Sequence, residues 1–323
     1  MAHASAVIDQ RPAHDSKPAV TYRHAGDRYL MVEYGEMVLD MTLNFFVQAV
    51  DRLVREAGID GLIETSPGFR SMLVGHDAAV LSRGDLIARL DDIHDAVPDQ
   101  SQLTIPSRLI TLPITFDDSQ SRDAVERYLR ITRADAPNAE GGNNIDYIVR
   151  YNGVPDREAL YDEVLGTEWW NAFTGFFPGL PFMFPLDTRH EIFAPKYNPT
   201  RLWTAEGAVG IGGPCVAIYP VESPGGYQLF GRTIPIYDIR GRNAAFRDDP
   251  ILIKPADRVR FERVEEDELL AAFAGVHEDC YRYRIEDAPF SVEAWLEQAA
   301  DHRDEAAAAR AVREQASRAT PLP

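Results

Sequence analysis

Proline and glycine crowd the stretch between residues 173 and 233, and they limit what this chain can fold into. The stretch holds one run at Phe173–Asp187 and a second at Lys196–Thr233, each broken by Gly or Pro every few residues. Such density is incompatible with long helices and with regular central strands. Short β-prone pieces from Trp169 to Arg240 therefore predict an irregular β-barrel. Where Gly and Pro gather with aromatic residues, the backbone is often shaped to approach a ligand closely.

Before residue 116 the pattern of apolar residues is different, because stretches with helical spacing alternate with stretches with strand spacing. The predicted elements are a strand at Tyr29–Tyr34, a helix through Leu43–Val54, a hairpin of Gly61–Thr65 and Phe69–Val74, a helix capped by Ser82, and a strand at Leu109–Thr115. A cap of this kind satisfies free N–H groups of the first helical turn. The order β-α-β-β-α-β matches the split βαβ, ferredoxin-like arrangement.

Further along, Arg122–Thr132 has helical spacing, and Asn138–Asn144 is predicted to be an exposed loop because it is rich in Asn and Gly. A last helix is expected from Pro289 through an Ala-rich, charged stretch to Arg318. The polar residues Met1–Pro18 predict a loose arm rather than a secretory signal. These patterns divide the chain into an arm (1–20), an α/β domain (21–104), a β-barrel domain (105–265) and an acidic C-terminal segment with a long helix (266–323).

Charge and cysteine content exclude several classes of protein. The formal net charge of −18 would repel nucleic acid backbones. Two distant cysteines, Cys215 and Cys280, cannot form a disulfide framework and favour a reducing compartment, so a cytoplasmic location is expected. No apolar run reaches the roughly 18 residues that a membrane span needs. The chain has no zinc motif and no Walker loop, so neither a protein-bound metal nor ATP held by such a loop is expected.

Four side chains of complementary chemistry lie close together in sequence: Glu222, Ser223, Gln228 and Arg232. They offer an acid, a hydroxyl, an amide and a planar cation suited to a carboxylate. Lys196 is a further candidate because the chain has only three lysines, and a lysine here could hold a carboxylated intermediate or affect a proton transfer. The alternative is that the glycines only turn barrel corners, that Glu222 and Arg232 form a structural pair, and that Lys196 is a surface lysine.

Several long motifs resemble a known family. The runs Phe176–Phe182, Gly207–Gly213 and Ile218–Thr233 resemble the signatures of the allophanate hydrolase subunit 1 family. The segments Ser66–Ser71 and Lys196–Thr204 are similar to the second half of the carboxyltransferase domain of biotin-dependent urea carboxylase. The resemblance covers roughly residues 22–300 and implies a ferredoxin-like domain followed by a cyclophilin-like β-barrel.

The resemblance also implies an activity that needs partners. Such a chain would work with a subunit-2-type homologue, a biotin carboxylase and a biotin carrier, move CO2 from carboxybiotin to the nitrogen of a small amide, and be inactive alone. ATP would be used by a partner. In this interpretation Lys196, Glu222, Ser223, Gln228 and Arg232 are catalytic. The expected substrate- and biotin-binding residues are Phe177, Pro178, Gly179, Phe182, Tyr197, Asn198, Arg201, Gly225, Gly226 and Tyr227.

Two alternatives stay open within this resemblance. Related subunit pairs hydrolyse 5-oxoproline with ATP and without biotin, and other relatives inhibit a histidine kinase by binding it. The segment Lys196–Thr204 favours the urea carboxylase side. The sequence Leu180–Met183 departs from the texture common in the lactam hydrolases, so the substrate could be urea, guanidine or another small amide.

Overall fold

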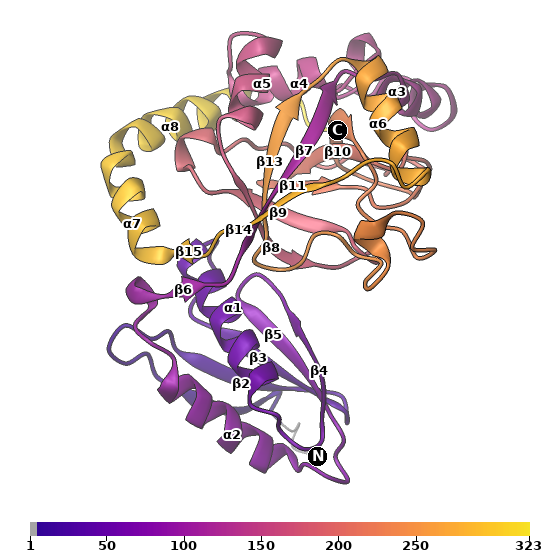
Figure 1. The fold of residues 1–323 in the computed structure, drawn as a ribbon. Helices are drawn as coiled ribbons and strands as arrows, with labels where there is room; N and C mark the ends of the chain where they lie inside the picture. Colours follow the sequence, from indigo (N-terminus) through magenta and orange to yellow (C-terminus); the bar gives the residue numbers. More distant parts are fainter. Residues whose placement is uncertain (1–4) are drawn as a thin grey trace. The chain divides into compact units, whose positions relative to one another are not determined.

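The computed structural model describes residues 5–323 and divides into two compact units (Figure 1). The first unit runs to Ser107 and includes Pro289–Glu297. The second comprises Arg108–Ala288 and Gln298–Pro323. Within the described residues no helix is both long and apolar enough to cross a membrane.

The first unit is built on an antiparallel sheet with the strand order β1-β2-β3-β5-β4. Its strands are β1 (Val7–Arg11), β2 (Val20–Ala25), β3 (Tyr29–Tyr34), β4 (Leu62–Pro67) and β5 (Ser71–His76). Helix α1 (Met41–Glu56) contacts β4 and β5 and lies against α2 (Arg83–Ala96). The buried residues alternate along β3, as expected for a strand with one covered face. A short turn η1 (Gln100–Gln102) and the pair β6 (Thr104–Ile105) and β15 (Phe290–Ser291) complete the unit.

The predicted strand at 29–34, the two helices and the hairpin are confirmed, including the Ser82 hydroxyl that accepts a bond from the Asp85 amide. Two predictions are wrong. Residues 109–115 do not complete this sheet but lie in β7 (Arg108–Phe116) of the second unit, and β2 occupies the place beside β3. The reason is that β7 is a nearly continuous buried run, which suits a strand covered on both faces.

The N-terminal arm is the second correction. Val7–Arg11 pairs with β2, and Arg11 forms ion pairs with Asp91 (3.1 Å) and Asp95 (2.5 Å) on α2. Few of the strand's residues are buried, so backbone bonds and these charges hold it rather than an apolar face. Residues 1–4 of the predicted arm lie outside the described residues.

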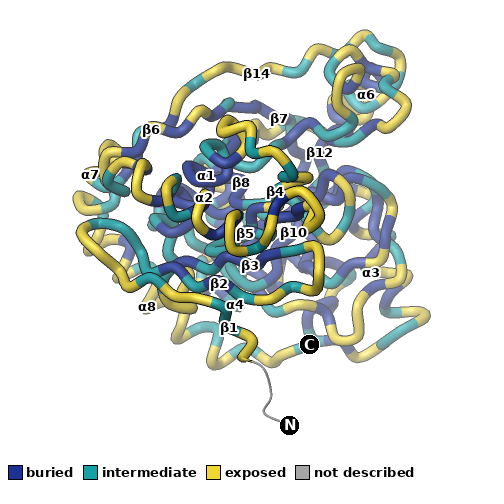
Figure 2. The backbone as a smooth tube through the Cα atoms, turned by 90° about the horizontal axis from the view of Figure 1, so that it is seen from below, coloured by how far each residue is buried: buried dark blue, intermediate teal, exposed yellow. Residues whose placement is uncertain are grey.

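The second unit is a closed mixed β-barrel. Its sheet has the order β12-β10-β11-β9-β8-β13-β7-β14, and β12 also pairs with β7, so seven strands form a ring. The remaining ring strands are β8 (Trp169–Thr174), β9 (Pro181–Pro185), β10 (Ala208–Gly212), β11 (Cys215–Ile218), β12 (Gln228–Thr233) and β13 (Arg258–Arg263). An odd number of strands cannot close with antiparallel pairs alone, and the β13–β7 pair is parallel. Strand β14 (Arg284–Asp287) pairs with the first half of β7 and is exposed throughout (Figure 2).

Helices cover the barrel and fill its ends. They are α3 (Ser119–Ile131), α4 (Ile145–Asn152), α5 (Arg157–Leu165), α6 (Glu266–His277) and α8 (Arg303–Ala319), with the short turns η2 (Glu140–Gly142), η3 (Thr188–His190) and η4 (Ala244–Phe246). Helix α7 (Val292–Asp301) precedes α8 and belongs mostly to the first unit. The core combines inward residues of the ring, such as Ile211 and Phe230, with Ile148 of α4 and Leu160 of α5. The barrel, the 122–132 helix and the C-terminal helical region are thus confirmed, although His302 divides the last helix in two.

Helix α8 docks on α4 and η3 of its own unit through a buried charge cluster. The Arg313 side chain is only 4% exposed; it bonds Glu163 (2.7 Å) and donates to the Arg189 carbonyl (2.8 Å). Glu163 also contacts His190 Nδ1 at 2.8 Å. These two partners hold the pKa of Glu163 below its ordinary value despite its burial. The carboxylate therefore stays charged at neutral pH and anchors the helix.

Arg313→Ala is expected to lower the free energy of unfolding by about 3 kcal/mol, because it leaves Glu163 buried with half of its partners. The matched control is Arg310→Ala on the same helix, whose pair with Glu191 is half exposed and should contribute less than about 1 kcal/mol. Urea unfolding of both variants measures the difference. Equal losses would show that the cluster does not anchor α8.

Candidate functional site

The second unit contains a cavity of about 230 Å³ formed by the proline- and glycine-rich segments. Its lining is mainly aromatic and aliphatic: Phe176, Leu180, Phe182, Lys196, Thr200, Ala217, Tyr219, Gly225, Gly226 and Tyr227. These residues come from the β8–β9 loop, β9, the segment between η3 and β10 that carries Lys196 and Thr200, the end of β11 with the following Tyr219, and the chain before β12. The volume is below the roughly 300 Å³ at which sites for drug-sized ligands begin, so the cavity suits a small group.

Two glycines let aromatic rings form the wall. A Cβ atom on Gly225 would lie 2.3 Å from the Tyr219 hydroxyl, and one on Gly212 would lie 2.4 Å from the Tyr227 ring. Neither distance is possible for a real side chain, so only Gly allows the backbone to approach the rings this closely. Gly212 lies on the neighbouring strand β10. The glycine density thus shapes a wall and does more than turn corners.

Phe176 stands at the rim of the cavity in a strained conformation. Its φ of 68° is rare for a bulky residue, and its side chain is 81% exposed. The turn is held by bonds from the Phe177 amide to the Gly175 carbonyl (2.8 Å) and from the Leu180 amide to the Phe177 carbonyl (3.1 Å). Strain and exposed apolar surface of this kind concentrate at binding sites.

Lys196 carries the only formal charge in the described cavity lining. Its Nζ lies 5.4 Å from the centroid of the Tyr227 ring, and no oxygen partner lies within bonding distance among residues 5–323. Burial raises the pKa of the Cys215 thiol, which lies against Tyr227, to about 12, and it raises the pKa of the Tyr227 hydroxyl as well. Both groups are neutral at pH 7, so the cation is not neutralised within the cavity.

Arg201 lies behind the wall and not in the cavity. It is 1% exposed, donates to the Tyr227 carbonyl (2.5 Å) and the Thr204 hydroxyl (3.2 Å), and lies 4.5 Å over the Tyr197 ring. In the described chain no carboxylate lies within 4 Å of this guanidinium. Buried charges are normally paired, so the Tyr227 carbonyl and the Tyr197 ring replace a counter-ion. Arg201 supports the wall rather than contacting a ligand in the cavity.

The other predicted catalytic residues are not gathered at the cavity. Gln228 is buried and bonds the Pro195 carbonyl (2.7 Å) and Asn138 (3.0 Å). Arg232, four positions along β12 and so about 13 Å away, donates to the Glu206 carbonyl (2.8 Å) and lies over Phe273. Glu222 is exposed, and the buried Ser223 hydroxyl has no partner among described atoms. Of the five residues, only Lys196 lines the cavity.

The predicted binding residues divide in a similar way. Phe182, Gly225, Gly226 and Tyr227 line the cavity, whereas Phe177, Pro178 and Gly179 belong to the loop of Phe176 without lining it. Tyr197 lies behind the wall, where burial raises the pKa of its hydroxyl. Asn198 is exposed, and its carbonyl accepts a bond from Arg133 (3.1 Å). Among residues 5–323, no three His, Cys, Asp or Glu side chains are placed to hold a metal ion.

The loop Asn138–Asn144 is not exposed as predicted. Asn138, Asn143 and Asn144 are at most 8% exposed, and the first and last bond Gln228 and Tyr197 behind the wall. The two glycines of the loop, Gly141 and Gly142, do lie outward and gave the stretch its flexible appearance. The run of asparagines was the available signal, because buried amides can join several backbone segments.

The model of the carboxyltransferase domain, subdomain C and D, matches residues 20–247. The chain belongs to this family. It is similar to the urea amidolyase of Lachancea kluyveri, 38% identical over 258 residues that cover 78% of this chain and 14% of that protein. A 5-oxoprolinase subunit of Bacillus subtilis is 26% identical over 251 residues, which cover 75% of this chain and 91% of that protein.

The crystal structure of the K. lactis urea amidolyase superposes with a TM-score of 0.85 at 32% identity, covering 98% of this chain and 19% of that one. The chain thus spans less than a fifth of the length of the amidolyases that it matches. The resemblance found in the sequence motifs is confirmed, and so is the α+β fold with an N-terminal antiparallel sheet, a barrel and C-terminal helices.

Gly225→Ala is expected to lower the free energy of unfolding by about 2 kcal/mol, because the added methyl collides with the buried Tyr219 ring. The matched control is the adjacent Gly226→Ala, whose methyl would meet the exposed Thr200 side chain at 3.3 Å and the Lys196 Cβ atom at 3.6 Å and should cost less than about 1 kcal/mol. Denaturant unfolding compares the two. A similar cost at both positions would contradict the wall geometry.

Proposed function

We propose that this chain supplies one part of a carboxyltransferase that moves CO2 from carboxybiotin, carried by a partner, to a nitrogen of urea or a related small amide. The observation that carries the proposal is the cavity: aromatic walls, one cation and no carboxylate, built from the family's motifs. Identity of 38% to a urea amidolyase supports the urea carboxylase side. The site would be shared with a subunit-2-type homologue, and a biotin carboxylase using ATP and a biotin carrier would complete the cycle.

The cavity lining fits the cofactor. Carboxybiotin joins a planar ureido ring, which bears one negative carboxylate, to an apolar sulfur-containing ring. Such a group needs apolar walls and a single cation, and Phe176, Phe182, Tyr227 and Lys196 provide them. Bound carboxybiotin would supply the activated CO2. The Lys196 side chain is exposed in this chain by itself. Its ammonium would bind the negative group, and a partner that closes the cavity would exclude water, which strengthens this interaction.

The remaining groups of the cavity bind and orient the substrate. The Gly226 N–H, which has no acceptor among the described residues, is a donor on the wall for an oxygen of the substrate. The described lining offers no carboxylate to remove a proton from the substrate nitrogen. In this proposal the residues of this chain position the substrate and the carboxybiotin, and residues of a partner complete the site. We also propose the finer fold names, with the first unit a variant of the ferredoxin-like arrangement and the second a cyclophilin-like barrel.

A second candidate is one component of an ATP-dependent lactam hydrolase. The observation that favours it is length: the matched region covers 91% of the 5-oxoprolinase subunit of Bacillus subtilis. In that case the same cavity would hold a lactam ring, and biotin would not be needed.

The test is co-expression with a subunit-2-type homologue, a biotin carboxylase and a biotin carrier, followed by assays of urea carboxylation and of ATP-dependent 5-oxoproline hydrolysis. Urea turnover is expected, with Lys196→Ala lowering kcat/KM about 100-fold because the cation meets developing charge. The control Lys254→Ala, whose ion pair with Asp249 lies outside the cavity, should retain activity. Hydrolysis of 5-oxoproline without urea turnover would favour the second candidate and contradict the first.

A further inference from the structure

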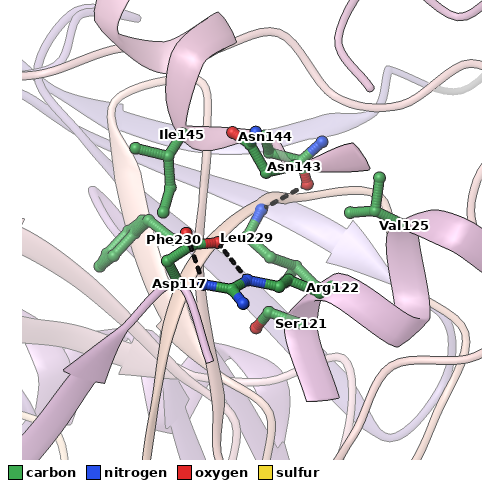
Figure 3. A pocket seen from close by; sticks show the side chains of 9 residues that line it. All are labelled: Asp117, Ser121, Arg122, Val125, Asn143, Asn144, Ile145, Leu229 and Phe230. Atoms are coloured by element: carbon green, nitrogen blue, oxygen red, sulfur yellow. Dashed lines mark hydrogen bonds and ion pairs between the residues drawn. The ribbon is translucent and has the colours of Figure 1, made fainter. Parts of the chain in front are cut away.

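Asn144 joins three segments that meet behind the cavity. Its Nδ2 donates to the Tyr197 hydroxyl (2.5 Å) and to the Asn138 carbonyl (2.6 Å), and its Oδ1 accepts from the Leu229 amide (2.9 Å). The side chain is 1% exposed. Asn144 and Leu229 of β12 both line a small void, and Figure 3 shows them with the other residues around it. One amide therefore links its own loop, the start of β12 and the segment that carries Lys196.

The two residues that flank Lys196 are both fixed by this arrangement. On one side, the Pro195 carbonyl accepts from Gln228, which in turn accepts from Asn138. On the other side, Tyr197 is held by Asn144 through its hydroxyl and by the Gly226 carbonyl through its amide (2.7 Å). The Lys196 side chain itself bonds no oxygen of the described chain. It is also exposed, so what this chain fixes of its position over Tyr227 is the place of its backbone, which these neighbours hold.

No other side chain of similar size can replace Asn144. An amide offers two donors and an acceptor, and three different bonds use them here. An aspartate would place an oxygen against the Asn138 carbonyl. The void beside Asn144 measures about 10 Å³, which is room for one water at most, so solvent cannot take over all three bonds in a shortened variant.

We propose that Asn144 is a positioning residue that holds Lys196 over the Tyr227 ring, in the orientation in which the ammonium meets the ligand. The role of Lys196 rests on the proposed function, whereas its placement by Asn144 does not. Displacement of a positioned group by about 1 Å can cost on the order of 100-fold in rate.

The small number of lysines allows a direct test on the full chain. Reductive methylation with ¹³C-formaldehyde labels Lys17, Lys196 and Lys254 and keeps their charge. Lys17→Arg and Lys254→Arg assign the signals. The ring current of the nearby Tyr227 should change the NMR chemical shift of the Lys196 methyl groups. Asn144→Ala should remove at least about half of that change in chemical shift, because the backbone around Lys196 is then no longer held.

The matched control is Asn243→Ala. Asn243 is equally buried and bonds the Tyr281 carbonyl and the Ala245 amide at 3.0 Å, with no bond to the cavity wall. It should leave the Lys196 signal unchanged while costing similar stability. If Asn144→Ala does not fold, Tyr197→Phe removes only the hydroxyl end of one bond and should shift the same signal in the same direction.

An unchanged Lys196 signal in Asn144→Ala would overturn the proposal. If Asn144→Ala does not fold, an unchanged signal in Tyr197→Phe would overturn it instead. An equal shift of the Lys196 signal in Asn243→Ala would also overturn it. In the assembled enzyme, Asn144→Ala should lower kcat more than it raises KM. A Lys196 signal that responds as expected in a chain that carboxylates no amide would leave the positioning role standing and remove the proposed function.

Discussion

Pairing of β12 with β7 is the constraint on which the rest of the second unit depends. Gly231–Thr233 bond Ile114–Phe116, and the Thr233 hydroxyl donates to the Pro113 carbonyl at 2.6 Å. This pairing converts an open sheet into a ring and so removes an exposed edge. Strand β12 begins at Gln228, directly after the residues that form the cavity wall, and Gln228 and Leu229 pair with β10 of the same ring. The irregular segment before β12 is therefore tied to a closed barrel and has little freedom.

The site combines a barrel that is apolar inside with a layer of buried amides and one buried guanidinium behind the wall. Each of these groups is costly to bury alone and favourable when its bonds are made. The groups belong to Asn138, Asn144, Gln228 and Arg201. Three of their bonds reach the backbone at the cavity, at the Pro195 and Tyr227 carbonyls and the Leu229 amide. The others join these residues to one another and to the Tyr197 and Thr204 hydroxyls. The arrangement specifies one backbone conformation where proline and glycine exclude regular structure. A chain of net charge −18 thereby presents a cavity whose only charge is positive.

Much of the fold could be predicted because its signals are local. The Ser82 cap, the apolar spacing through Leu43–Val54 and the change of texture at Trp169 each depend on neighbouring residues, and each is confirmed. The assignment of 109–115 to the first sheet failed because a buried apolar run carries no information about which sheet it joins. Likewise, residues 7–11 form an edge strand by pairing with β2, and Arg11 is held by two carboxylates of α2, which is distant in sequence.

The candidate site was predictable in its segments and not in its individual residues. Proximity in sequence suggested that Gln228 and Arg232 act together, but four positions along a strand place them far apart. Asn144 could not be found by its neighbours in sequence, because its three bonds reach Asn138, Tyr197 and Leu229. The family motifs contain the residues that line the cavity, because Gly225 and Gly212 within them are needed for the backbone to approach the Tyr219 and Tyr227 rings.

Hydrogen exchange of the backbone amides in the wall tests most directly whether the irregular segment is rigid. The amides of Tyr197, Arg201, Gly225 and Leu229 all donate to acceptors within this network. If the barrel and the buried amides hold the segment as described, these amides exchange only through global unfolding, at the same rate as the amides of the ring strands. Exchange as fast as that of the amide of the exposed Gly141 would contradict the account.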